Sequence, residues 1–195
     1  KSGEFVLSHD GIAEHPVLGK KRISDLTLAE LGECRLERAG KKYRIPTLDE
    51  ALKVIPSDGI WMNVDCYCGF GNLQDLVRHF KARGRIGQSC FRGDIRDIVE
   101  MRKAVPELIA NNGERTGPRD RDWTDEECQK YVDATLANKC LFLQLSRPWA
   151  RKYSDACHAA GIKVIHYKSD EPSEMPDLRA RGIDFVMTNR PADME

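Results

Sequence analysis

The residues best suited to chemistry stand at the end of the stretch Gly59–Tyr67, whose sequence predicts a buried β-strand. Strand side chains alternate between faces, so Trp61, Asn63, Asp65 and Tyr67 share one face, which becomes polar toward its end, while the other face is apolar. A carboxylate there is costly to bury unless a metal, a cation or a hydrogen-bond donor meets it. Asp65 is therefore a candidate ligand-binding residue, although these residues alone favour a simple turn aspartate.

A histidine and a lysine end two other predicted strands. His9, next to Asp10, closes a predicted strand at 5–10. An imidazole titrates near neutral pH, so His9 is equally well interpreted as a general acid or base and as a surface-loop histidine. Lys168 offers a cation and Tyr167 an aromatic wall after the strand at 162–167, although a lysine in this position is more often solvated surface.

Composition excludes several functional classes. The chain has 31 Lys and Arg residues and 31 Asp and Glu residues, giving a formal net charge of zero, so we expect no nucleic-acid partner. No apolar segment approaches the ~20 residues that cross a bilayer. The seven scattered cysteines argue against a disulfide framework and favour a reducing compartment such as the cytoplasm. The close pair Cys66 and Cys68 lacks the second cluster that a structural zinc site needs.

Helices and strands are predicted to alternate along the chain. Capping boxes at Thr47 and Thr124 and an N-cap at Asp94 mark helix starts, and a helix is also expected over 24–37. Six strands are predicted after the opening arm, at 59–67, 85–91, 107–112, 140–145, 162–167 and 184–188. Their ends are polar: Asp65, Ser89, Asn112, Gln144, the run 166–168, and Thr188 with Asn189. Such alternation requires a parallel sheet with helical crossovers.

Two architectures fit this alternation. In a (β/α) barrel the polar strand ends converge on the active face. An open doubly wound sheet should carry a glycine-rich phosphate loop, and no G-x-G-x-x-G motif occurs. We therefore predict an α/β barrel forming one incomplete domain over 1–195. Residues 1–5 predict the turn and outgoing strand of a hairpin already under way, so Lys1 is not expected to be a natural start.

Several segments resemble the glycerophosphodiester phosphodiesterase family in order and spacing: Gly3–Asp10, Ile23–Leu31 and Ile45–Leu52. The ending Gly182–Pro191 is similar to the family's closing strand, which usually carries Asp where Asn189 stands. Gln88–Phe91 is similar to its central Gln-Ser-Phe strand with Cys90 as an inserted residue. The resemblance covers essentially the whole chain.

The resemblance implies a (β/α)8 TIM barrel that hydrolyses small-molecule glycerophosphodiesters to an alcohol and glycerol phosphate with Ca²⁺ or Mg²⁺. It implies that His9 is one of two acid/base histidines and that Asp65 replaces a metal-binding carboxylate, normally Glu. Tyr67, Tyr167 and Lys168 would contact substrate. The metal would offset charge on the phosphoryl oxygens while a histidine protonates the departing alkoxide.

Besides Asn189 and Cys90, this chain departs from the family pattern at three further places. The family's Glu-x-Lys pair is Asp65-Cys66-Tyr67, and its Trp-Thr-x-Asn strand end is Tyr167–Asp170. The first two barrel strands, with a His-Arg-Gly motif and a Glu-x-Asp metal pair, are expected to be missing from this sequence. Two alternatives therefore stay open: a non-catalytic barrel that binds a phosphodiester or polyol phosphate, and a fragment whose unpaired strand edges make it associate.

Overall fold

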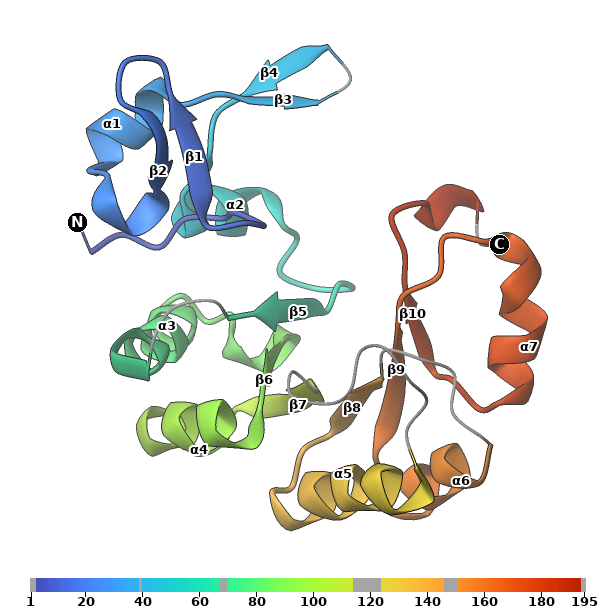
Figure 1. Ribbon diagram of the computed structural model, residues 1–195. Helices are drawn as coiled ribbons and strands as arrows, with labels where there is room; N and C mark the ends of the chain where they lie inside the picture. Colours follow the sequence, from blue (N-terminus) through green and yellow to red (C-terminus); the bar gives the residue numbers. More distant parts are fainter. Residues whose placement is uncertain (1–2, 39, 67–69, 114–123, 146–150, 194–195) are drawn as a thin grey trace. The chain divides into compact units, whose positions relative to one another are not determined.

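A computed structural model describes residues 3–38, 40–66, 70–113, 124–145 and 151–193. The chain divides into two compact units, Lys1–Ile60 and Trp61–Glu195, called here the N-terminal unit and the barrel unit (Figure 1). That residues 1–195 form a single domain stays a prediction.

The N-terminal unit is built from two hairpins and two short helices. Its elements are β1 (Ile12–His15), β2 (Gly19–Arg22), a 3-10 turn (Ile23–Asp25), α1 (Leu28–Glu33), β3 (Leu36–Arg38), β4 (Lys41–Tyr43) and α2 (Leu48–Val54). β1 pairs antiparallel with β2, and β3 with β4. The core of this unit consists of Ala13, Leu26, Leu31, Cys34 and Ile45.

The strand predicted at 5–10 is wrong. The structure has a single antiparallel bridge there, between Val6 and Thr47. The Ser8 hydroxyl accepts a hydrogen bond from the Gly11 N–H at 3.2 Å, and Gly11 has a φ of +65°. This side-chain turn, with a glycine in the left-handed region, reverses the chain before a ladder can form.

The helix predicted over 24–37 is wrong in extent. Thr27 is the N-cap, because its hydroxyl accepts from the Glu30 N–H while the Glu30 carboxylate accepts from the Thr27 N–H. α1 therefore begins at Leu28 and ends at Glu33, and Leu36 begins β3 instead of extending the helix.

In its described residues, the barrel unit holds a six-stranded sheet and five α-helices. The strands are β5 (Met62–Asp65), β6 (Ser89–Gly93), β7 (Ile109–Gly113), β8 (Phe142–Leu145), β9 (Lys163–Tyr167) and β10 (Phe185–Met187). The helices are α3 (Phe70–Ala82), α4 (Ile95–Ala104), α5 (Asp125–Ala137), α6 (Arg151–Ala159) and α7 (Met175–Ala180). Short 3-10 turns lie at Ile86–Gln88, Pro172–Glu174 and Pro191–Asp193. The strand order follows the sequence and every pairing is parallel, as predicted.

Capping side chains explain where α2 of the N-terminal unit and α4 and α5 of the barrel unit begin. The capping boxes predicted at Thr47 and Thr124 are both confirmed. In each, the threonine hydroxyl accepts from the N–H of the glutamate three residues later, and that glutamate's carboxylate accepts from the threonine N–H. The Asp94 carboxylate accepts from the N–H groups of Arg96 and Asp97, at 2.9 and 3.0 Å. Asp94 follows the last residue of β6 directly, so strand and helix join without a loop.

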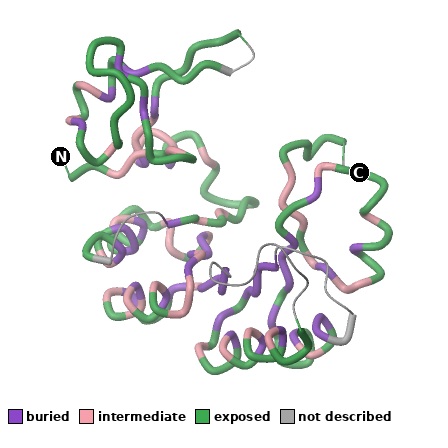
Figure 2. Tube along the Cα trace, viewed as in Figure 1, coloured by how far each residue is buried: buried purple, intermediate pink, exposed green. Residues whose placement is uncertain are grey.

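The helices pack on the outer face of the sheet, where the buried residues gather along the strands (Figures 1 and 2). Leu143 of β8 and Val164 of β9 join a core with residues of α5, α6 and α7. On the other side of the unit, Phe91 of β6 packs edge-on against Phe80 of α3, with ring centroids 5.1 Å apart. This outer layer holds the strands in place.

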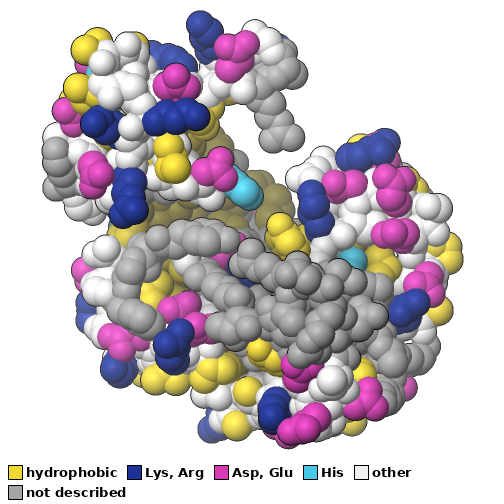
Figure 3. Space-filling view, viewed as in Figure 1, with side chains coloured by type: hydrophobic (Ala, Val, Ile, Leu, Met, Phe, Trp, Pro, Cys, Tyr) yellow, Lys and Arg dark blue, Asp and Glu magenta, His cyan; other side chains and the backbone are white. Residues whose placement is uncertain are grey.

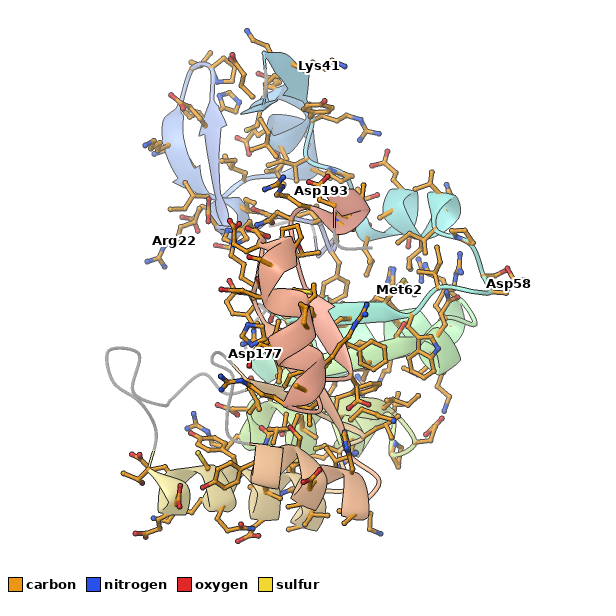
Figure 4. All side chains as sticks on the ribbon, turned by 90° about the vertical axis from the view of Figure 1, so that its right-hand side faces the viewer. Arg22, Lys41, Asp58, Met62, Asp177 and Asp193 are labelled. Atoms are coloured by element: carbon orange, nitrogen blue, oxygen red, sulfur yellow. The ribbon has the colours of Figure 1, made fainter. Side chains whose placement is uncertain are left out.

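The inner face of the sheet curls around an aromatic layer. Phe142 of β8 packs edge-on against Trp61 at 6.2 Å and against Phe185 of β10 at 6.0 Å between centroids. One layer higher, Asn63 Nδ2 of β5 lies 3.9 Å from Met187 Sδ of β10. The first and last strands therefore meet across the interior. Figure 4 labels Met62 in β5 and Asp177 in α7, the helix that precedes β10. This is an α/β TIM-barrel-like arrangement.

The described surface carries charge of both signs. In the view of Figure 3, Lys and Arg side chains are interspersed with Asp and Glu side chains. Among the described helices, none is long and apolar enough to cross a membrane.

Candidate active site at the carboxyl ends of the barrel strands

Asp65, the last residue of β5, is held by an arginine of the neighbouring strand. Arg92 Nη1 of β6 donates to both carboxylate oxygens of Asp65, at 3.0 and 2.9 Å. The two residues are register partners, so their side chains leave the sheet on the same inner face. The Arg92 side chain is 12% exposed and that of Asp65 is 38% exposed, so this ion pair is partly desolvated.

A glycine of the next strand makes room for Arg92. A Cβ built on Gly113 of β7 would lie 2.3 Å from Arg92 Nε and 2.4 Å from its Cγ. The arginine stem therefore crosses directly over Gly113, and only a residue without a side chain permits this path. Arg92 Nε is buried and makes no hydrogen bond to the described residues. Packing thus fixes the Arg92 stem, and its terminal Nη1 makes the hydrogen bonds to Asp65.

A buried amide network lies below this pair on the inner face. Asn111 Nδ2 of β7 donates to Asn63 Oδ1 at 3.1 Å and to Gln144 Oε1 of β8 at 3.2 Å. The Cys90 thiol of β6 also donates to Asn63 Oδ1, at 3.4 Å. Asn111 is fully buried, and its Oδ1 atom has no hydrogen-bond partner among the described residues. The network joins four strands and fixes the floor of the site.

A second charged cluster follows β9 and β10. Asp170 accepts hydrogen bonds from the Asn189 N–H at 2.7 Å, from Asn189 Nδ2 at 2.9 Å and from the Thr188 hydroxyl at 3.1 Å. Lys168 Nζ lies 3.3 Å from the same carboxylate. The bonds from the Asn189 backbone and side chain hold the pKa of Asp170 well below its ordinary range, against a smaller desolvation effect. Lys168 is therefore an already paired cation.

Of the two tyrosines predicted to contact substrate, Tyr167 lies within the described residues and Tyr67 does not. Tyr167 is 43% exposed and ends β9, in register with Met187, so its ring leaves the sheet on the inner face. Tyr67 lies outside the described residues, as do the loop arginines Arg115, Arg119 and Arg121. Substrate contact by Tyr67, Tyr167 and Lys168 stays a prediction.

His9 belongs to the N-terminal unit. Its Nδ1 lies 2.6 Å from Asp10 Oδ1, and its side chain is 94% exposed. A neighbouring carboxylate can orient an imidazole, which a general acid or base requires. Catalysis by His9 stays a prediction.

Three predicted polar strand ends do not face the site. Ser89 begins β6 instead of ending it, and its hydroxyl donates to the Arg85 carbonyl at 2.7 Å. Asn112 points outward and donates to the Thr135 hydroxyl of α5 at 2.8 Å. His166 is buried on the outer face, where burial lowers its pKa against the opposing charge of Glu174. Of these three side chains, Asn112 joins its strand to a helix, and Ser89 ties the start of β6 to the turn before it.

The sequence analysis missed Arg92 because the strand was predicted to end at Phe91. The N-cap at Asp94 carried the missing signal, since it leaves no loop between strand and helix. Extending the strand to Gly93 puts Arg92 beside Asp65.

The donor set of the described residues does not fit a divalent cation. No three His, Cys, Asp or Glu side chains come close enough together to hold a metal ion within the described ranges. Asp65 directs both oxygens at a guanidinium, which repels a cation placed on the same oxygens. A metal role for Asp65 therefore stays a prediction.

Comparisons with known proteins agree on the fold and the family. The model of the glycerophosphoryl diester phosphodiesterase family matches residues 1–193. No curated protein matches the chain. Among solved structures, an Oleispira antarctica phosphodiesterase in complex with the product sn-glycerol-3-phosphate is 20% identical, with a TM-score of 0.74 over 98% of this chain and 78% of that one.

Two further structures are glycerophosphodiester phosphodiesterases. The one from Thermotoga maritima is 18% identical, with a TM-score of 0.71 over 99% of this chain and 78% of that one. The one from Agrobacterium tumefaciens is 12% identical, with a TM-score of 0.73 over 97% and 79%. At these identities the structures show the fold, and the family match over residues 1–193 shows that the chain belongs to the glycerophosphoryl diester phosphodiesterase family and is a glycerophosphodiester phosphodiesterase-like hydrolase.

Proposed function

We propose that this protein binds glycerophosphodiesters at the carboxyl ends of β5 to β10 and hydrolyses them to an alcohol and glycerol phosphate. The observation that carries the proposal is that two ion pairs, Asp65 with Arg92 and Lys168 with Asp170, lie at these strand ends in a chain of this family. In a barrel, residues at this edge bind and transform the substrate. The two cations provide charge that suits a phosphodiester anion.

In this proposal the strand-end residues bind and orient the substrate. The guanidinium of Arg92 holds a phosphoryl oxygen through its terminal N–H groups, and the ring of Tyr167 covers the alcohol part of the substrate. His9 protonates the departing alkoxide oxygen. The amide network beneath the site keeps β5 to β8 in register while the substrate binds.

The proposal includes two strands beyond the six described ones. Among the described residues, β5 and β10 each pair on one side only, which leaves one edge of each strand available. We propose that two further strands, with a second histidine and a Glu-x-Asp pair, complete an eight-stranded barrel. In that complete site the Glu-x-Asp pair would hold Ca²⁺ or Mg²⁺, which would offset charge on the phosphoryl oxygens.

The test is an assay of glycerophosphocholine turnover that follows release of glycerol phosphate, with and without added Mg²⁺ or Ca²⁺. His9→Ala should lower the rate by a factor on the order of 10² to 10⁴, the usual contribution of general acid–base catalysis. His79→Ala, which changes a half-buried histidine of α3, is the matched control. Undiminished turnover in His9→Ala would end the role given to His9.

A second candidate function is a barrel that binds a phosphodiester or polyol phosphate without turning it over. The ion pair between Asp65 and Arg92 favours it, because an arginine occupies the carboxylate that the family resemblance assigns to a metal. Saturable binding of glycerophosphocholine with no product after prolonged incubation would support this candidate. Turnover would exclude it.

A further inference from the structure

Arg92 is the most deeply fixed cation of the described site. Its stem lies over Gly113, its Nε is sealed from solvent, and its two contacts to Asp65 are both made by Nη1. A guanidinium presents its N–H groups in a rigid plane, a geometry that matches phosphate as well as carboxylate. A guanidinium so positioned loses little conformational freedom when an anion binds.

Asp65 is then the anion that Arg92 binds when no substrate is present. Its carboxylate neutralises Arg92 in the absence of substrate, and being 38% exposed it is more accessible to solvent than its 12% exposed partner. An incoming phosphate can share the guanidinium or take the place of the carboxylate on it. The same pattern recurs at Lys168, which is paired with Asp170 at the end of β9. At these strand ends, acidic side chains thus position both Arg92 and Lys168 before an anion binds.

We infer that Arg92 is the phosphate-binding group of this site, that Asp65 competes with phosphate for it, and that sn-glycerol 3-phosphate binds here without a divalent metal. This inference rests on the proposed function and adds to it how the anion is recognised. It also assigns Asp65 a role opposite in sign to that of a metal ligand, since removing the carboxylate should strengthen anion binding.

The experiment is calorimetric titration of sn-glycerol 3-phosphate into the protein in EDTA, and again with Mg²⁺ or Ca²⁺. Arg92→Gln should weaken binding by roughly tenfold or more, the factor expected for losing hydrogen bonds between charged groups. Asp65→Asn should tighten binding in EDTA, because the competing negative charge is gone while the side-chain shape is kept. Arg78→Gln, which removes an exposed arginine of α3 paired with Asp75, should leave the affinity unchanged.

Gly113→Ala tests the geometry without changing any charge. The added methyl group would overlap the Arg92 stem, so the guanidinium must move and the affinity should fall, as in Arg92→Gln. Far-UV circular dichroism and urea midpoints identify variants that fold. If either substitution prevents folding, Asp65→Asn still decides the question, because it only replaces one oxygen of a partly exposed side chain with nitrogen.

The outcomes separate this inference from the proposed function. Metal-dependent binding that Asp65→Asn abolishes would overturn the role of Arg92 and leave the proposed function standing. Equal affinities for the wild type, Arg92→Gln and Asp65→Asn would also overturn the inference. If neither sn-glycerol 3-phosphate nor glycerophosphocholine binds with or without metal, the proposed function fails as well.

Discussion

At the residue scale, the sequence located Asp65 but not its partner. Alternation along the strand correctly put Asp65 on the polar face at the strand's end, and the burial of β5 alternates in the same way. The contact with Arg92 depends on the register between β5 and β6, which a sequence pattern does not contain. The path of Arg92 over Gly113 also needs coordinates, because it joins residues of different strands.

Asp170 and Asn189 are two departures from the family pattern that contact each other in the structure. The family resemblance implies Asn at position 170 and usually Asp at position 189, where this chain has Asp170 and Asn189. The structure puts these two side chains in contact, with Asn189 Nδ2 donating to Asp170 Oδ2 at 2.9 Å. The two departures are therefore one exchange, in which carboxylate and amide trade places across β9 and β10.

This exchange gives a test by double substitution. Asp170→Asn should lower the urea midpoint, because an amide oxygen replaces a carboxylate that accepts from Asn189, Thr188 and Lys168. Asn189→Asp should also lower it, by facing two carboxylates. The double variant should lose less in its urea midpoint than the two single variants lose together, since it restores a carboxylate–amide pair. Strictly additive losses would contradict the exchange.

The same carboxylate predicts a pH dependence of stability. The folded-state pKa of Asp170 is depressed, so its contribution is fully present above the unfolded pKa of about 3.9 and is lost as the pH falls toward the folded value. Between pH 7 and about pH 3, the urea midpoint of Asp170→Asn should therefore fall less than that of the wild type. Parallel curves for the two proteins would show that Asp170 does not contribute in this way.

At the scale of elements, helices were predicted better than short strands. Helix starts depend on side chains within four residues, so the boxes at Thr47 and Thr124 were visible in the sequence. The hairpin strands of the N-terminal unit were not, because segments such as Gly19–Arg22 are wholly polar and exposed and have no apolar alternation. Their pairing is set by glycine turns and by the small core behind them.

The capping box of α5 can be tested alone. Thr124→Ala removes the hydroxyl that accepts from the Glu127 N–H at 3.2 Å, and should cost about 1 kcal/mol of unfolding free energy. Thr124→Ser is the matched control, because serine keeps the hydroxyl and caps helices well. Urea denaturation followed by far-UV circular dichroism measures both. An equal loss in the two variants would assign the effect to the threonine methyl group instead of the cap.

At the scale of the molecule, helix–strand alternation predicted a parallel sheet in sequence order, and the structure confirms it. Alternation does not reveal how far such a sheet curls. That depends on inner-face packing, in which Asn63 of β5 reaches Met187 of β10. The side chains responsible come from strands 124 positions apart in the chain. The polar strand ends and the missing glycine-rich loop favoured a barrel over an open sheet, and the family resemblance implied the same curl.

The aromatic layer should therefore stabilise the curled sheet as a whole. Phe142 is 8% exposed and contacts both Trp61 and Phe185, so Phe142→Ala should cost about 3–5 kcal/mol of unfolding free energy through lost burial and a cavity. Phe185→Ala is the matched control, because that ring is 52% exposed and touches Phe142 from one side, and its cost should be clearly smaller. Urea denaturation followed by tryptophan fluorescence measures both losses, since Trp61 borders the layer. Equal costs for the two variants would mean that Phe142 is no more buried in solution than Phe185, and that β5 and β8 do not meet through this layer.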